Sequence, residues 1–197
     1  MSATRDGRPH RYINTKQPGA IVFVTTTCLD FARAFQRSEM RERAVISILR
    51  DSQRYGTNLH AFVVMTHHIH LLVKCADNRN VSWLMQRMKS NLAKLALPWL
   101  DDFERSELAT QSGLNQRSFW KPSFRALSVD SEHVFGQKVR YIHENPVRAK
   151  LAERPDDYRW SSSRLWNSGL WHDEYGLDLD RVLEEFNQAI TTSLDLG

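Results

Sequence analysis

The sequence predicts an α+β protein with a ferredoxin-like split β-α-β-β-α-β sheet, its helices on one face, and a C-terminal extension. Three observations lead to this class. The apolar patterns follow the order strand, helix, strand, strand, helix, strand, helix. The strand-like runs are short and β-branched, and the helical runs end at stop or capping residues. In this arrangement we expect the second face of the sheet to be open, and a functional site would lie there.

The predicted strands share apolar and β-branched side chains, and they cover residues 20–28, 59–65, 69–74 and 119–129. The short polar break Thr66-His67 favours an antiparallel pairing of the second and third strands. The predicted helices with apolar positions at helical spacing cover residues 39–55, 81–97, 131–145 and 179–190. Residues 99–118 show no clear periodicity, and we expect a loop there with a short helix over 101–108. Ser38 is the candidate cap of the first helix and Gly56 ends it, whereas Pro146 is expected to begin a separate helical turn.

The chain is expected to contain three segments. Residues 1–18 form a flexible basic arm, residues 19–152 form the α+β domain, and residues 153–197 form a Trp-rich extension packed on that domain. Two cysteines are too few for a disulfide framework, and no apolar run is long enough to cross a membrane. These features predict a cytoplasmic protein.

Charge is unevenly distributed along the chain. The net charge is +4 and the pI is about 9.2. Seven of the 23 acidic residues but only one basic residue, Arg181, follow position 171, so the preceding part is distinctly basic. A basic body suits a polyanionic partner, because neutralising phosphates releases counterions. A solvated surface with a compensating acidic tail accounts for the charge equally well.

His68-Ile69-His70 is the strongest local signal for chemistry. Alternate residues of a strand share a face, so the two histidines project together while Ile69 points into the core. Two adjacent imidazoles offer nitrogens to one metal ion. His67 is expected to face away or to lie in the turn. Two solvent-facing histidines without a metal are the structural alternative at this point.

The helix predicted over 131–145 carries a second polar group. Tyr141 and Asn145 are four residues apart and share a face, with Lys138 one turn earlier. Val139 and Ile142 lie on the opposite, inward side. An amide oxygen is a ligand that hard divalent ions accept, and a lysine offsets negative charge in a transition state. A half-buried tyrosine and a helix-terminal asparagine are the structural alternative.

The sequence also offers candidates for contact with nucleic acid. The basic ones are expected to contact phosphates, and Trp120 and Phe124 are expected either to stack on unpaired bases or to pack in the core. The candidates are Arg87, Lys89, Asn91, Lys94, Trp120, Lys121, Phe124, Lys138, Arg140, Arg148 and Lys150.

Four segments in order give these residues a context. They resemble the signatures of single-tyrosine HUH transposases, and of the REP-associated tyrosine transposase branch in particular, over about residues 15–165. The segments are VMTHHIHLLV (64–73), FWKPSF (119–124), YIHENPVRA (141–149) and YRWSS (158–162).

The resemblance implies a transposase-type endonuclease and strand transferase that acts on single-stranded or hairpin, REP-like DNA. It implies His68, His70 and Asn145 as ligands of Mg²⁺ or Mn²⁺, and Tyr141 as the nucleophile that forms a 5′-phosphotyrosine link. Relatives of this kind include dimers and monomers, so both states remain open.

Two positions depart from the family pattern. His67 stands where the branch more often has Asn, and Arg125-Ala126-Leu127 stands where many relatives carry a Tyr-Asp pair. The second departure weakens the assignment of a catalytic acid there. A DNA-binding module without cleavage and a small metal-binding protein unrelated to DNA remain as competing functions.

Overall fold

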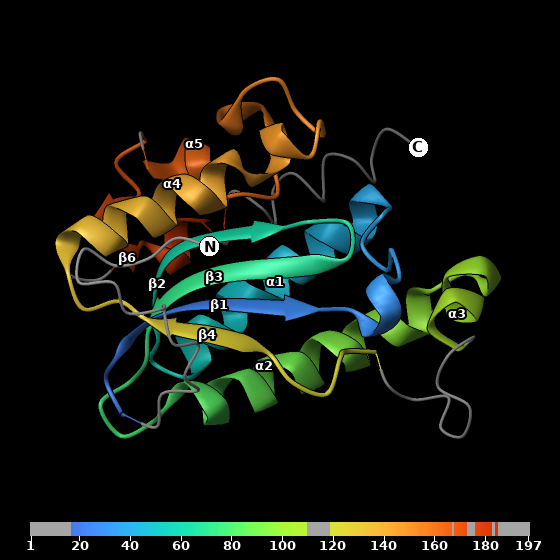
Figure 1. The fold of residues 1–197 in the computed structure, drawn as a ribbon, viewed down its shortest axis with the longest axis horizontal. Helices are drawn as coiled ribbons and strands as arrows, with labels where there is room; N and C mark the ends of the chain where they lie inside the picture. Colours follow the sequence, from blue (N-terminus) through green and yellow to red (C-terminus); the bar gives the residue numbers. More distant parts are fainter. Residues whose placement is uncertain (1–16, 110–118, 167, 173–175, 183, 185–197) are drawn as a thin grey trace, which may run out of the picture.

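A four-stranded antiparallel sheet forms the centre of the protein (Figure 1). The structure is a computed structural model that describes residues 17–109, 119–166, 168–172, 176–182 and 184. The strand order is β2-β3-β1-β4, and the strands are β1 (Ile21–Thr27), β2 (Asn58–Val64), β3 (His68–Lys74) and β4 (Arg125–Ser128). The predicted α+β class and split strand order are thus confirmed.

The helices flank this sheet. They are α1 (Ser38–Arg54), α2 (Val81–Ala96), α3 (Asp102–Ala109), α4 (Glu132–Arg148) and α5 (Ser163–Trp166), with short 3-10 turns η1 (Leu29–Phe31), η2 (Leu97–Trp99) and η3 (Pro155–Asp157). A small second sheet pairs β5 (Trp171–His172) with β6 (Gly176–Leu177).

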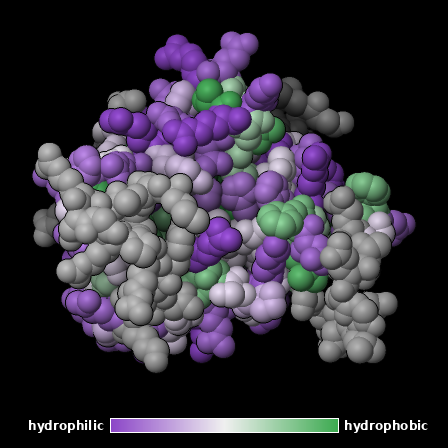
Figure 2. Space-filling model, in the orientation of Figure 1, coloured by the Kyte–Doolittle hydropathy of each residue, from purple (hydrophilic) through white to green (hydrophobic). Residues whose placement is uncertain are grey.

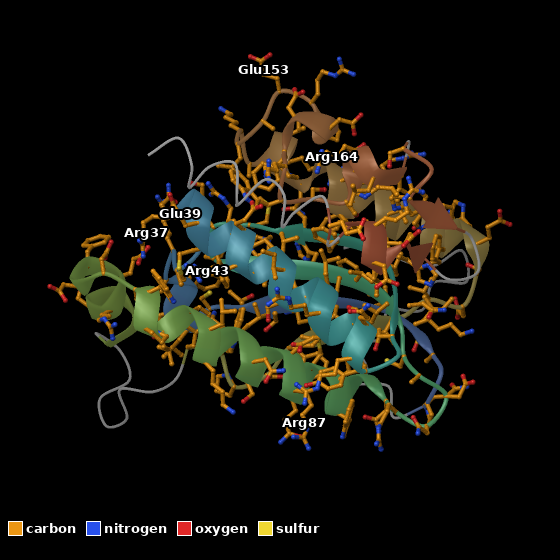
Figure 3. The ribbon with its side chains drawn as sticks, turned by 180° about the vertical axis from the view of Figure 1, so that it is seen from behind. Arg37, Glu39, Arg43, Arg87, Glu153 and Arg164 are labelled. Carbon is orange, nitrogen blue, oxygen red and sulfur yellow. The ribbon has the colours of Figure 1, made fainter. Side chains whose placement is uncertain are left out.

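The helices cover both faces of the sheet, which corrects the expectation that they share one face. Helices α1 and α2 lie behind the sheet in Figure 1 and in front of it in Figure 3, whereas α4 crosses the other face. The physical reason is that α4 has an apolar stripe of its own, with Val139 and Ile142 buried against Val63 and Leu72. The apolar run Leu71-Leu72-Val73 already signals a strand buried on both sides.

The two faces alternate along each strand. On β3, Ile69 and Leu71 enter the large core beneath α1 and α2, where Val22 and Val24 of β1 also lie. His68 and His70 project from the opposite face, under α4. A shift of register by one residue would exchange these two sets, so the burial of the apolar set fixes which face carries the histidines.

Several boundaries differ from the prediction. Strand β4 is shorter than expected, because Pro122 interrupts the segment and Trp120 makes only an isolated bridge with Cys28. Ser38 lies inside α1, and Arg37 occupies the cap position. Pro146 lies within α4, so the expected separate turn is part of one continuous helix. Most of the last predicted helix lies outside the described residues. Within the described part, residues 179–182 are helical.

The C-terminal segment covers the β2 edge of the sheet. The amide of Val64 donates to the carbonyl of Trp160 at 2.9 Å, and the amide of Ser162 donates to the carbonyl of Phe62 at 3.0 Å. The edge strand is therefore hydrogen bonded on both sides, which removes a template for unwanted pairing. The predicted arm at 1–18 lies almost wholly outside the described residues.

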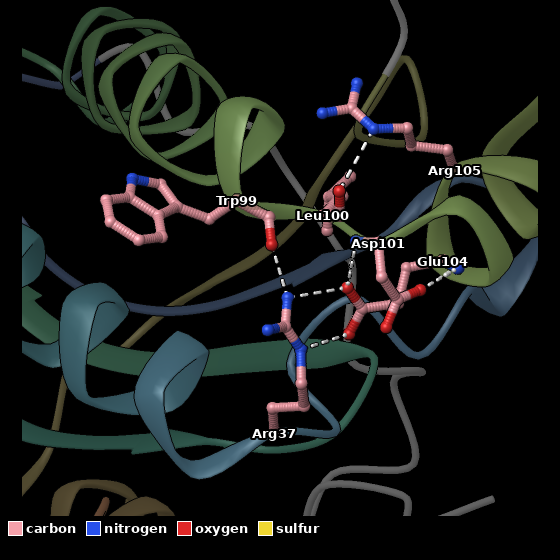
Figure 4. A network of polar contacts seen from close by, with 6 residues as sticks. All are labelled: Arg37, Trp99, Leu100, Asp101, Glu104 and Arg105. Carbon is pink, nitrogen blue, oxygen red and sulfur yellow. Dashed lines mark hydrogen bonds and ion pairs between the residues drawn. The ribbon is translucent and has the colours of Figure 1, made fainter. Parts of the chain in front are cut away.

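Helix α3 is anchored to the start of α1 by a polar network (Figure 4). The guanidinium of Arg37 donates to both carboxylate oxygens of buried Glu104, at 3.1 and 2.9 Å, and to the carbonyl of Trp99. A two-pronged pair of this kind fixes orientation as well as distance. Among the described helices, none is long and apolar enough to span a membrane.

Candidate active site between the sheet and α4

Two imidazoles converge at the start of β3. The Nε2 atoms of His68 and His70 lie 3.1 Å apart. Two nitrogens bound at right angles to one octahedral ion, each at about 2.1 Å, are about 3.0 Å apart. This spacing is compatible with a single ion held by both Nε2 atoms, and the role of the pair as metal ligands stays a prediction.

Thr25 orients His70. This threonine lies directly opposite His70 on the neighbouring strand β1, and its Oγ1 is 2.8 Å from Nδ1 of His70. When Nδ1–H donates to the hydroxyl, Nε2 keeps its lone pair and points toward His68. A hydrogen bond of this kind sets both the tautomer and the ring angle of a metal-binding histidine. Sequence reasoning missed Thr25, because only the strand register identifies which threonine of Thr25-Thr26-Thr27 faces His70.

Both histidines are held in the neutral form. The pKa of His68 is lowered to about 4, first by burial and then by the nearby His67, whereas a hydrogen bond with the Asn145 side chain acts in the opposite direction. Burial lowers the pKa of His70 well below its ordinary value, with contributions from His68, His67 and Lys138. Unprotonated imidazoles are the form that binds a metal ion, so neither ring needs to lose a proton near neutral pH.

Helix α4 brings Tyr141 to this pair. The tyrosine ring lies 5.3 Å from the ring of His70 and 5.7 Å from that of Phe23, edge-on to the latter. Burial of Val139 and Ile142 beneath the helix fixes its rotation, and Tyr141 then stands at the border of the site with 36% of its surface exposed. The side chain is thus both close to the imidazoles and open to a substrate.

Three further side chains of α4 complete the surroundings. Asn145 approaches His68 closely enough to raise its pKa, and it lies one turn after Tyr141. Lys138 places its ammonium 5.1 Å from the ring centre of Phe23, and burial lowers the pKa of this lysine. Arg148 lies 5.7 Å from the ring centre of Tyr141 and pairs with Glu144.

The donor set fits a hard divalent ion. Two imidazole nitrogens and one amide oxygen leave positions for water and for a phosphate oxygen, as Mg²⁺ and Mn²⁺ sites commonly do. Within the described ranges, no group of three or more His, Cys, Asp and Glu side chains gathers at one point. Asn145 is the side chain near His68 and His70 with a suitable oxygen. His67 lies in the turn before β3, with its ring 4.5 Å from that of His68.

The predicted DNA-contacting residues divide into two sets. Trp120 is buried and its indole donates to the carbonyl of Lys89, which leaves this ring no open face for a base. The ammonium of Lys89 donates to the carbonyls of Lys121 and Ser123. Phe124 packs against the large core. Trp120, Lys89 and Phe124 therefore make their contacts within the protein.

The other basic candidates are at or near the surface but lie in different places. Lys138 and Arg148 border Tyr141, whereas Arg140 lines a separate cavity on the other side of α4. Lys150 follows the end of α4 with a φ of 58°. Arg87 projects from α2, which lies on the opposite side of the sheet from α4 (Figure 3), and Lys94 is an exposed residue of the same helix. On the face seen in Figure 2, hydrophilic side chains predominate over α4.

Asn91 is half-buried, and its amide is engaged within the protein. Its amide donates to Asp51 at 2.8 Å and to the hydroxyl of Tyr55 at 2.9 Å, which ties α2 to α1. This side chain therefore holds two helices together.

Solved structures that are similar to this chain include two transposases and a guanylyltransferase. A REP-associated tyrosine transposase bound to a REP hairpin superimposes with a TM-score of 0.59 at 15% identity, over 81% of this chain and 86% of that one. A putative transposase from Deinococcus radiodurans R1 gives 0.43 at 22% identity, over 70% and 96%. The tRNA(His) guanylyltransferase of Saccharomyces cerevisiae gives 0.43 at 12%, over 72% and 63%.

Comparison of the sequence itself gives the family. No curated protein matches the chain. The family model described as "Transposase IS200 like" matches residues 23–145, which run from β1 to the asparagine of α4 and include both histidines and Tyr141. The chain therefore belongs to the IS200-like transposase family.

Proposed function

We propose that this transposase cuts and rejoins single-stranded DNA at the site formed by His68, His70 and Tyr141. The observation that carries the proposal is the contact between the Tyr141 ring and the ring of His70, whose Nε2 is 3.1 Å from that of His68. A nucleophile and a pair of converging imidazoles are thus brought together by elements far apart in the sequence.

In the proposed reaction, the phenolic oxygen of Tyr141 bonds to the phosphorus as the bond between phosphorus and the 3′-oxygen breaks. The phenolic proton passes to solvent, and the leaving 3′-oxygen takes up a proton. One phosphoester bond replaces another, so a 3′-OH can later attack the 5′-phosphotyrosine and release the enzyme without an external energy source.

The chain's own residues prepare this step. Thr25 keeps the Nε2 lone pair of His70 directed at His68, and Lys138 supplies a fixed positive charge on the same side of α4 as Tyr141. His68, His70 and Asn145 would hold Mg²⁺ or Mn²⁺, and an ion bound there would act as a Lewis acid toward the phosphate and the leaving oxygen.

We further propose that a single chain forms a complete site. Tyr141 lies beside the His70 of its own chain, so no second copy is needed to supply the nucleophile. Mixing a Tyr141→Phe variant with a His68→Ala variant should then restore no activity. Restored adduct formation in the mixture would show that the tyrosine acts on a partner's histidines.

The substrate we propose is a DNA hairpin with an unpaired flank. Support comes from the family, from the basic character of the chain before position 171, and from the fold shared with a transposase bound to a REP hairpin. The strand we propose to be cleaved runs past Lys138 and Arg148, which border Tyr141.

The test is incubation with labelled hairpin DNA from the flanks of its own gene and Mn²⁺, followed by a denaturing gel. We expect a covalent protein–DNA adduct that Tyr141→Phe abolishes while DNA binding persists. Tyr55→Phe, on the α1 side of the sheet, is the matched control and should keep the adduct. An adduct that survives Tyr141→Phe would refute the nucleophile, and DNA binding without any adduct would favour a binding module.

A further inference from the structure

The turn after β1 holds an exposed aromatic ring in a strained backbone. Asp30 and Phe31, both of them non-glycine residues, have φ values of 50° and 61°, in the left-handed region. This backbone conformation is unfavourable for residues other than glycine, and it persists where the surrounding structure imposes it. Phe31 nevertheless leaves 59% of its surface exposed, so burial of its ring does not explain the strain.

Backbone hydrogen bonds impose this conformation. The amide of Cys28 donates to the carbonyl of His67 at 2.8 Å, and the amide of Leu29 donates to the carbonyl of Phe119 at 3.0 Å. The amide of Lys121 donates to the carbonyl of Thr27 at 3.0 Å. Three segments are thus tied together around buried Cys28, and the ring of Phe31 is presented by a rigid support.

The ring of Phe31 contacts a residue that borders the candidate active site. Its centre lies 5.8 Å from the ring of His67, which lies 4.5 Å from the ring of His68. The ammonium of Lys121 lies 3.5 Å from the ring centre of Phe31. The rings of Phe31 and His68 are therefore separated by no more than about the rise of three stacked nucleotides.

We propose that Phe31 stacks on an unpaired base of the DNA strand beside the cleaved phosphate, with Lys121 at the adjoining phosphate. This inference rests on the proposed function, because it places the base relative to the His68 site. A base in a duplex has both faces covered by its neighbours, so a stacking ring favours single-stranded DNA. An exposed ring beside a lysine and close to the phosphate site matches the composition of single-strand binding surfaces.

The chain offers a closely matched control. Trp99 is also exposed, at 54%, and carries a cation over its ring, with the guanidinium carbon of Arg43 at 3.7 Å. Trp99 ends η2, which follows α2, and its ring lies against Arg43 of α1, whereas Phe31 lies next to the turn that precedes His68. Phe31→Ala and Trp99→Ala therefore remove similarly exposed rings, of which Phe31 is in contact with the His67 ring beside the proposed site.

The experiment measures binding in a Tyr141→Phe background, so that cleavage does not enter. Fluorescence anisotropy compares an oligothymidylate of about 12 nucleotides with an abasic strand of equal length. We expect the parent to prefer the strand with bases and Phe31→Ala to weaken its binding by about 5- to 100-fold. Phe31→Trp should retain the preference, and Trp99→Ala should leave it unchanged.

The outcomes separate this inference from the proposed function. Unchanged binding in Phe31→Ala, or a parent that binds both strands equally, overturns the stacking site whether or not an adduct forms on hairpin DNA. The stacking site is supported if Phe31→Ala loses the preference for the strand with bases while Trp99→Ala keeps it. Absence of the Tyr141 adduct from the gel contradicts cleavage, and the binding result still decides whether Phe31 contacts bases.

Discussion

The two faces of the central sheet are built from the same strands but differ in kind. The face beneath α1 and α2 is lined by aliphatic side chains such as Val24 and Leu71, and it joins a large buried core. The face beneath α4 carries Thr25, His68 and His70, which alternate with the aliphatic residues along β1 and β3. Both faces bury apolar side chains, and the α4 face also uses this rigid support to hold polar groups in place.

The largest effect is expected from His68→Ala on the α4 face. Loss of this imidazole should lower the rate of adduct formation by at least about 1000-fold, because the divalent ion that would offset the charge of the phosphate loses one of its ligands. The free energy of unfolding should not fall much, since Nδ1 of His68 is buried with no hydrogen-bond partner among the described residues. Gel assays and urea unfolding measure the two quantities.

His133→Ala is the control for that variant. His133 is an exposed residue of the first turn of α4, where its ring contacts Gln137. Its removal should leave the adduct rate within a few-fold of the parent. An unaffected rate in His68→Ala would remove His68 from the proposed site.

Leu49→Ala tests the opposite face. Leu49 of α1 is fully buried, so truncation should lower the free energy of unfolding by about 2–5 kcal/mol, through lost burial and a cavity. The adduct rate per folded molecule should stay unchanged under conditions where the variant is folded. A variant that is as stable as the parent but slow in catalysis would contradict the division between the two faces.

Thr25→Val and Thr26→Val compare neighbouring residues that point to opposite faces. Removal of the Thr25 hydroxyl should weaken metal-dependent activity by about 10- to 100-fold, since Nδ1 of His70 loses its partner. The hydroxyl of Thr26 is buried with no partner in the described structure, so Thr26→Val should keep activity and equal or exceed the parent in stability. Metal titration and the adduct assay distinguish the two, and equal losses would rule out an orienting role for Thr25.

The smallest expected effect concerns surface charge. Lys138→Gln, beside Tyr141, should reduce the salt dependence of single-strand binding by about 0.7 in the slope of log K against log salt. Arg87→Gln, on α2 behind the sheet, should leave that slope unchanged, because the proposed path of the strand lies on the other face. Anisotropy titrations at several salt concentrations give the slopes. Equal changes in both variants would place the strand across both faces.

Much of the fold follows from local patterns. Period-two and helical spacings identified the strands and helices close to their observed bounds, and the split order gave the sheet. Those patterns did not place α4, since spacing shows that a helix has an apolar stripe but not which surface buries it. Pro122 limits β4 to a short strand, whereas Pro146 lies within the continuous helix α4. The different effects of the two prolines depend on the contacts that surround them.

The candidate site was predicted unevenly for the same reason. His68 and His70 share a face by strand geometry alone, and Tyr141 and Asn145 share a face by helix geometry. Neither rule shows that the two pairs meet. Phe31 gave no sequence signal, because its value as a candidate comes from a left-handed backbone and from contacts with Lys121 and His67.

The sequence by itself determined the class of fold through the order of its strands and helices. It identified the histidine pair and the tyrosine as candidates through strand and helix spacing together with the ordered resemblance of four segments. Tertiary structure decided which sheet face α4 covers, that Thr25 rather than Thr26 orients His70, and that Trp120 is buried while Phe31 is exposed. These outcomes depend on strand register and on the competition of apolar surfaces for burial, which involve residues distant in the chain.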